Sequence, residues 1–135
     1  MPSPRDAVAA GVATFVVAAA VLAGFLNLGG PSGQRQLQLD RTRVENLRTL
    51  SNEIRVRYGS SRKLPATLDE AAGHRAPRDP LTHQAYEYSA TGGTGYQLCA
   101  TFARDNRDEM TNFPGPFWNH PAGHHCYALD AEQVN

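Results

Sequence analysis

The sequence predicts an α+β protein, in which an N-terminal transmembrane helix precedes an amphipathic helix packed on a small antiparallel sheet. Three observations predict this fold. Residues 7–28 are apolar and uncharged, residues 34–58 repeat apolar positions at helical spacing, and alternating strand-like segments follow. The 135 residues suffice for one anchor and one small domain. We expect a tail at 1–6, a transmembrane helix at 7–28, a hinge at 29–33 and a soluble domain at 34–135.

The apolar run at 7–28 is long enough to cross a bilayer. No charged residue lies between Asp6 and Arg35. As a helix the run would rise about 33 Å, against a hydrocarbon core of about 30 Å. The alternative is a cleaved signal peptide, but the run is too long for one and Arg5 is offset by Asp6. We therefore expect a retained anchor.

Small side chains recur along this predicted anchor. Small residues four positions apart let a second helix approach closely inside a membrane. An alanine-rich segment also produces this spacing by chance, so a specific helix partner and chance composition both stay open. The candidate helix-packing residues are Ala9, Ala13, Ala20 and Gly24.

Basic residues and cysteines make opposite predictions about topology. Arg35, Arg41 and Arg43 follow the anchor and favour a cytoplasmic C-terminal domain. Cys99 and Cys126 favour an external one, because stable disulfides form outside the reducing cytosol. We give more weight to the cysteines and expect an external domain.

A long amphipathic helix is predicted at residues 34–58. Its apolar positions lie three, four or seven residues apart, while arginines and acidic residues occupy the other faces. Gly59 is placed to cap its C-terminus. The predicted buried stripe consists of Leu37, Val44, Leu47, Ser51, Ile54 and Tyr58.

A short helix and a turn should connect this helix to the sheet. Thr67 and Glu70 have the spacing of a capping box, and the helix that they begin should end at Gly73. In Asp79-Pro80-Leu81-Thr82 the aspartate can accept backbone N–H bonds while the proline fixes φ. This segment is therefore predicted to be a turn.

Three strands are expected after the turn. The first covers residues 85–89, a glycine-rich hairpin loop follows at 91–95, and the second strand runs from 96 to 102. The third contains the alternating residues His125, Tyr127 and Leu129.

Cys99 and Cys126 fall on two of these strands, each on the face opposite to the aromatic residues. A disulfide between them would close a loop of about 28 residues and stabilise a small domain by about 3–4 kcal/mol. The alternative is a pair of buried free thiols. We expect the disulfide.

Three motifs, in order, give the chain a family resemblance. Leu64-Pro65-Ala66-Thr67-Leu68, Asp79-Pro80-Leu81-Thr82 and Tyr86-Glu87-Tyr88 resemble segments of type II secretion pseudopilins and their type IV pilin relatives. The resemblance covers about residues 47–98. It implies a pilin-like fold with the sheet domain in the periplasm of a bacterium and the anchor in the cytoplasmic membrane.

The chain also departs from the pilin pattern. It lacks the prepilin cleavage site, and no acidic residue lies between Asp6 and Asp40, where the family carries its assembly glutamate. These departures favour a static subunit over a filament subunit.

A loop rich in aromatic residues and prolines lies inside the predicted disulfide loop. Exposed aromatic side chains of this kind anchor protein interfaces or contact membrane surfaces. The alternative is that they fold back as a satellite core. The candidate contact residues are Phe113, Phe117 and Trp118.

Three histidines close to Cys126 have spacing that could offer nitrogen ligands to zinc or copper. However, neighbouring residues of a strand point to opposite faces, and Cys126 is used by the disulfide. We therefore expect no metal and no other cofactor. The weak candidate ligands are His120, His124 and His125.

The sequence gives no sign of catalysis. It contains no nucleophile elbow, phosphate-binding loop or dinucleotide fingerprint. Its 13 basic and 13 acidic residues balance, which gives no reason to expect nucleic acid as a partner. We expect a non-catalytic accessory subunit that docks on the periplasmic face of a larger membrane complex, such as a respiratory or photosynthetic electron-transfer assembly. The alternatives are a minor pseudopilin-like component of a secretion or pilus machine and a metal-binding periplasmic module.

Overall fold

The computed structural model describes residues 4–27, 31–107 and 115–133. Within the first two helices, the side chains of residues 4–7, 9, 10, 25–27 and 31 fall outside this description. The chain divides into two compact units, residues 1–35 and 36–135. We call the second unit the head. Three α-helices and a three-stranded antiparallel sheet make the described part an α+β protein, as predicted.

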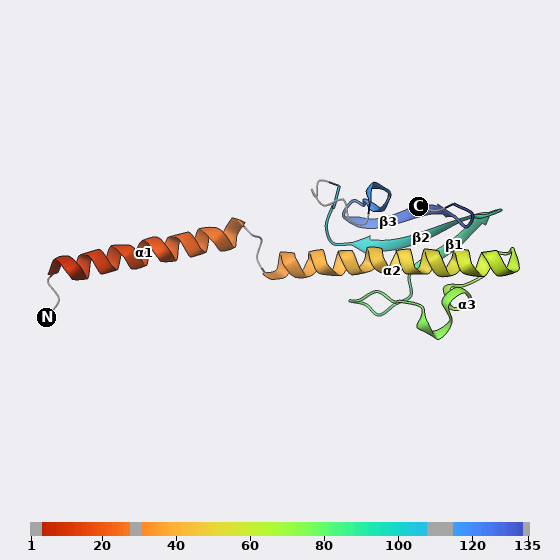
Figure 1. Cartoon of the computed structure of the whole chain (residues 1–135), viewed down its shortest axis with the longest axis horizontal. Coiled ribbons are helices and arrows are strands. Elements are labelled where there is room, and N and C mark those ends of the chain that lie inside the picture. Colours follow the sequence, from red (N-terminus) through yellow and green to blue (C-terminus); the bar gives the residue numbers. More distant parts are fainter. Residues whose placement is uncertain (1–3, 28–30, 108–114, 134–135) are drawn as a thin grey trace. The chain divides into compact units, whose positions relative to one another are not determined.

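Helix α1 spans Pro4–Asn27 and contains most of the apolar run (Figure 1). Among the residues that the structure describes, no helix combines the length and the apolar character needed to cross a membrane. The predicted transmembrane segment at 7–28 is therefore helical as far as Asn27 but is not supported as a span.

Helix α2 spans Pro31–Ser61 and is longer than predicted at both ends. Residues 31–33 of the predicted hinge are helical, because proline is well tolerated in the first turn of a helix, where its missing N–H is not needed. The other two hinge residues, Gly29 and Gly30, lie outside the described residues.

The C-terminal end of α2 is at Ser61, so the prediction of a cap at Gly59 is wrong. The hydroxyls of Ser60 and Ser61 donate to the carbonyls of the preceding turn, at 3.2 and 3.0 Å. Arg62 then takes the left-handed conformation, with φ of 54°, and its N–H donates to the carbonyl of Tyr58 at 2.7 Å. The chain thus reverses at an arginine rather than at the glycine.

The short helix α3, Leu68–Ala72, begins at the predicted capping box. The Thr67 hydroxyl accepts the N–H of Glu70 at 3.2 Å, and the Glu70 carboxylate accepts the N–H of Ala66 at 2.7 Å. The predicted stop at Gly73 is confirmed, since α3 ends immediately before it and a single 3₁₀ turn, Gly73–Arg75, follows.

The sheet has the order β1-β2-β3, with both neighbouring pairs antiparallel (Figure 1). The strands are β1 (Glu87–Gly92), β2 (Gly95–Phe102) and β3 (Gly123–Asp130). Gly92 and Gly93 both have positive φ, of 114° and 60°, which lets β1 reverse tightly into β2. β1 begins two residues later than predicted, so Tyr86 is buried just outside the strand.

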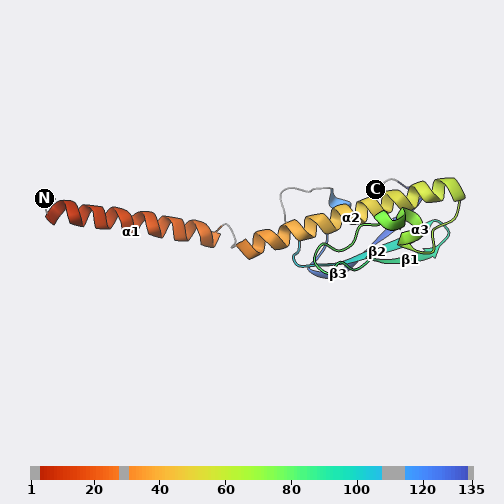
Figure 2. The same cartoon turned by 90° about the horizontal axis from the view of Figure 1, so that it is seen from below.

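The core of the head lies between α2 and one face of the sheet (Figure 2). The predicted stripe is confirmed for Val44, Leu47, Ser51 and Ile54, which are buried, whereas Leu37 and Tyr58 are only half-buried. Leu50 is fully buried and was not predicted. The sheet contributes its inward-facing residues to the same core: Tyr96, Leu98, Ala100, Phe102, Tyr127 and Leu129.

Candidate functional site

A buried charge network joins α2 to the turn before the sheet. Arg43 is 5% exposed and donates from Nε to Oδ2 of Asp79 at 2.6 Å, and from one terminal nitrogen to Asp40 at 2.8 Å. Burial lowers the pKa of Arg43, but the hydrogen bonds and charges of Asp79 and Asp40 outweigh burial and raise it. The guanidinium is therefore a permanent charge shared by two carboxylates.

Both carboxylates of this network also accept backbone N–H groups. Asp40 accepts the N–H groups of Ala103 and Arg104 at 2.9 to 3.0 Å, where β2 ends. Asp79 accepts those of Leu81 and Thr82 at 2.9 Å, which confirms the predicted turn. Burial raises the pKa of Asp79, but the hydrogen bonds from Arg43 and the turn outweigh it and hold the pKa well below its ordinary value. The network fixes three segments of the head.

A groove of about 390 Å³ lies beside this network. The turn and the segment leading to β1 form one wall, and β2 from Cys99 to Phe102, with Ala103 after it, forms the other. Its charged residues include Arg43 and Asp79, which already neutralise each other. The groove therefore offers a mixed polar and apolar surface.

The predicted disulfide between Cys99 and Cys126 is present. The two residues are directly paired across β2 and β3, with their Cα atoms 4.0 Å apart. His124 lies on the same face of β3, and its Nε2 is 3.1 Å from a carboxylate oxygen of Glu87 on β1. This face of the sheet, opposite to the core, thus carries a cystine next to a histidine–carboxylate pair.

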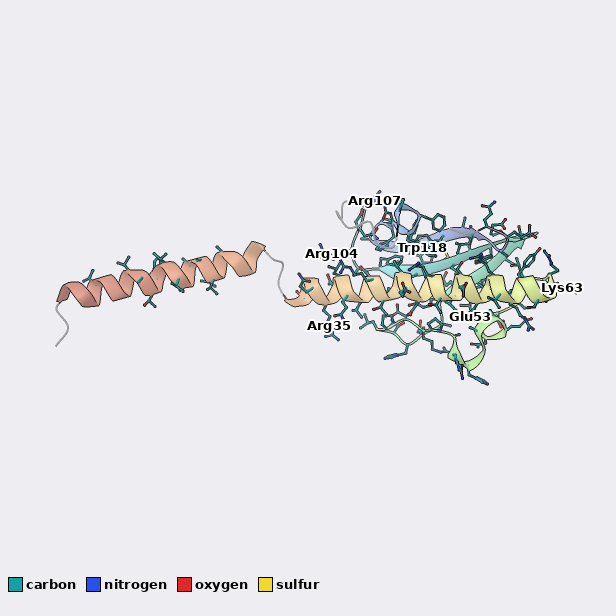
Figure 3. All side chains as sticks on the ribbon, in the orientation of Figure 1. Arg35, Glu53, Lys63, Arg104, Arg107 and Trp118 are labelled. Atoms are coloured by element: carbon teal, nitrogen blue, oxygen red, sulfur yellow. A yellow bond between two sulfur atoms is a disulfide. The ribbon has the colours of Figure 1, made fainter. Side chains whose placement is uncertain are left out.

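The aromatic residues expected to contact a partner have different environments. Trp118 is 4% exposed and belongs to the core cluster, which matches the alternative that these aromatic residues fold back onto the domain (Figure 3). Its carbonyl accepts the hydroxyl of Tyr127 at 2.9 Å, and the two rings pack with centroids 4.8 Å apart. Phe117 is 40% exposed and packs edge-on against Trp118. Phe113 lies outside the described residues.

The three histidines named as weak metal candidates do not converge. His120 is buried and stacks on Phe102, with ring centroids 3.6 Å apart, and burial lowers its pKa. His125 packs edge-on against Tyr127, on the side of the sheet that faces the core. His124 is exposed on the other face. Because neighbouring residues of a strand point to opposite faces, His124 and His125 lie on opposite faces of β3.

Helix α1 exposes large apolar side chains around most of its circumference. The exposed fractions of these side chains range from 52% to 76%. The residues are Val8, Val12, Phe15, Val16, Val17, Val21 and Leu22. At about 100° per residue they leave two sectors of roughly 100° uncovered.

One of the two uncovered sectors of α1 holds the predicted small-residue positions. Positions 9, 13, 20 and 24 fall within about 60° of one another around the helix axis. Ala13 and Ala20 are exposed, and a Cβ atom added at Gly24 would meet no other heavy atom within 4 Å. The side chain of Ala9 lies outside the described residues. The four positions thus share one face of α1.

Asp40 is the structural residue that sequence reasoning missed. Its signal was weak but present: an acidic residue three positions before Arg43, early in a helix whose other faces are rich in arginine. Its partners at Ala103 and Arg104 lie more than sixty positions away, so no local pattern could name them.

Comparisons with known proteins give no match for this chain. No protein-family description, no curated protein and no solved structure matches it. Nothing in these comparisons identifies the chain as a pilin or pseudopilin, and function must be argued from the residues described above.

Proposed function

We propose that this protein is a non-catalytic accessory subunit, held in the bacterial cytoplasmic membrane by α1 and docked through its head on the periplasmic face of a larger membrane complex. A respiratory or photosynthetic electron-transfer assembly is one complex of this kind. The observation that carries the proposal is the exposed apolar surface of α1, because a helix that is apolar on nearly all sides needs an apolar environment.

Lipid is the environment that suits α1. Residues 7–28 have the length of a bilayer span and contain no charge. Water would leave seven large apolar side chains more than half exposed. Since no span is found among the described residues, membrane insertion rests on the sequence of 7–28 and on these exposed side chains.

The periplasmic orientation rests on the disulfide. A cystine between directly paired strands is expected to persist in an oxidising compartment. Three arginines after the apolar run favour a cytoplasmic head instead. One of them, Arg43, is buried and neutralised by Asp40 and Asp79, which weakens that argument. The other two, Arg35 and Arg41, are exposed.

A minor pseudopilin-like component of a secretion or pilus machine is the second candidate. The specific observation in its favour is a long helix, α2, that carries an antiparallel sheet and is tied to an Asp-Pro turn by Arg43. That role requires removal of a leader peptide by a prepilin peptidase. The intact mass of the chain purified from its own host therefore separates the two candidates.

Membrane insertion is tested by adding carboxylates to α1 and, as a control, one carboxylate to α2. Val16→Asp with Val17→Asp places two carboxylates in the middle of α1, whereas Val56→Asp places one at a valine that is 60% exposed on α2. Wild type and Val56→Asp should stay in the membrane fraction after alkaline carbonate washing and should need detergent for release. The α1 variant should lose membrane retention, because each carboxylate opposes insertion by about 2.5–3.5 kcal/mol.

Orientation and docking need two further measurements. Protease added to spheroplasts should digest the head, and protection until lysis would place it in the cytosol instead. Purification of tagged chain in mild detergent should retain multi-pass partners at fixed stoichiometry. A chain that purifies by itself would contradict the docking proposal.

A further inference from the structure

The face of the sheet opposite to the core places four potential metal ligands on three neighbouring strands. Glu87 on β1 is paired with Cys99 on β2, and Cys99 is paired with Cys126 on β3. His124 precedes Cys126 by two positions, so both side chains project from the same face of β3. Strand pairing therefore gathers residues that are far apart in the sequence.

These side chains are close enough to share one ion. One ligand atom from each of Cys99, His124 and Cys126 lies within 4.8 Å of the other two. No other group of three histidine, cysteine or acidic residues meets this condition in the described part of the chain. Cys99 is buried, Cys126 is half-buried and His124 is exposed, so an ion from solvent can approach past His124.

The oxidation state of the sulfurs decides whether these ligands are usable. In the disulfide, neither sulfur is a thiolate, and His124 is the one strong ligand left among the three. A dithiol reductant would break the S–S bond by thiol–disulfide exchange. Its two electrons and two protons pass to Cys99 and Cys126, and the dithiol itself becomes a disulfide.

We propose that reduction of this disulfide creates a Zn²⁺ site, with the thiolates of Cys99 and Cys126 and a ring nitrogen of His124 as ligands. Thiolate and imidazole are the ligands that Zn²⁺ prefers, and water fills the fourth position of its tetrahedron. Binding releases the two thiol protons. The disulfide prevents metal binding in the oxidised chain, because its sulfurs are then not thiolates.

Glu87 is a positioning residue for this site. Its carboxylate lies 3.1 Å from Nε2 of His124, which leaves Nδ1 for the ion and fixes the orientation of the ring. Carboxylate–histidine–zinc arrangements of this type strengthen metal binding by about 10- to 100-fold.

The sheet keeps the ligands in place after reduction. Eight residue pairs join β2 to β3, and Cys99↔Cys126 is one of them. The side chains on the other face, including Leu98 and Tyr127, are buried in the core. The backbone positions of the ligands therefore do not depend on the S–S bond.

The test uses the full-length chain in detergent micelles. The disulfide is reduced with a phosphine, which takes up the oxygen of water as a phosphine oxide, and the phosphine is removed without air. Co²⁺ is then titrated in as a spectroscopic probe. Reduced wild type should bind one Co²⁺ per chain, with thiolate charge-transfer absorption that Zn²⁺ abolishes, and oxidised wild type should show none.

Substitutions of His124 and Glu87 distinguish binding at this site from non-specific binding. His124→Ala should weaken Co²⁺ binding by about tenfold or more, and Glu87→Gln by about tenfold. His74→Ala, which removes an exposed histidine from the 3₁₀ turn, should leave binding unchanged. Unchanged affinity in His124→Ala, or no charge-transfer band in reduced wild type, would overturn the proposal.

Fluorescence of Trp118, the one tryptophan of the chain, reports whether the reduced head is folded. Loss of its buried emission on reduction would also overturn the proposal, since the ligands depend on the sheet. The site does not depend on membrane insertion of α1, so each proposal can fail separately.

Discussion

Nε of Arg43 lies 2.6 Å from Oδ2 of Asp79, so one buried guanidinium joins α2 to the turn that leads into the sheet. The same guanidinium bonds Asp40 one turn earlier on α2, and Asp40 holds the end of β2 through the N–H groups of Ala103 and Arg104. Helix, turn and strand are thereby tied at a single point.

Removal of Arg43 should destabilise the head strongly. Arg43→Met would leave Asp40 and Asp79 facing each other without a cation, and removal of one partner from a buried pair costs about 3–5 kcal/mol. Arg48→Met is the matched control, because its pair with Glu45 is exposed and contributes about 1 kcal/mol or less. Chemical denaturation followed by Trp118 fluorescence measures both. Equal effects of the two substitutions would refute the role given to Arg43.

The contribution of Asp79 should depend on pH. Its folded pKa is lowered, so its ionised form stabilises the head above the unfolded pKa of about 3.9, and this stabilisation is lost as the pH falls toward the folded pKa. Denaturation midpoints of wild type and Asp79→Asn should therefore differ most near pH 7 and should converge below about pH 4. A difference that stays constant over this range would show that the charge of Asp79 is unimportant.

The disulfide should contribute about 3–4 kcal/mol to the stability of the head. Cys99 and Cys126 are 27 positions apart, and the bond restricts this loop in the unfolded chain. The double variant Cys99→Ala, Cys126→Ala should show this loss in denaturation, and adding a reductant should lower wild type to about the same midpoint. No effect of the reductant on the double variant serves as the control.

Phe117 and Trp118 should respond differently to truncation. Trp118→Phe removes less buried area than an alanine substitution would. It should still destabilise the head by about 1–3 kcal/mol. Phe117→Ala removes a ring that is 40% exposed and should change stability less. Because Phe117 is accessible, its loss should instead reduce the amount of partner that co-purifies. Tyrosine fluorescence or circular dichroism measures stability in the variant that lacks Trp118.

Local signals predicted those parts of the fold whose determinants are close in sequence. Thr67 and Glu70 predicted the start of α3 because both partners of the capping box lie within one turn. The alternation around Cys99 and Cys126 predicted the disulfide, because strand periodicity fixes which side chains share a face. The Asp79 turn was predicted for the same kind of reason.

Features that depend on distant residues were missed or misplaced. Trp118 was named as a candidate contact with folding back left open, because its proline-rich surroundings gave no sign of the packing against Tyr127. Arg43 was counted as a free basic residue, although its partner Asp79 lies 36 positions away. The end of α2 moved from Gly59 to Ser61 because serine hydroxyls bond the carbonyls of the last turn.

The small-residue face of α1 gives the last prediction. Gly24→Leu fills this face, and an added Cβ meets no side chain beyond its two chain neighbours within 4 Å, so the substitution should not clash within the protein itself. Leucine also favours helix over glycine by about 0.8–1 kcal/mol, so α1 should not be weakened.

If another helix packs against this face, Ala20→Leu and Gly24→Leu should reduce co-purification of membrane partners in mild detergent, because close approach requires small side chains. Leu22→Phe, which adds bulk to the opposite side of α1, should leave co-purification unchanged, and Trp118 fluorescence should show an intact head in all three variants. Equal recovery of partners with Gly24→Leu and Leu22→Phe would mean that the small residues reflect alanine-rich composition and that docking uses the head.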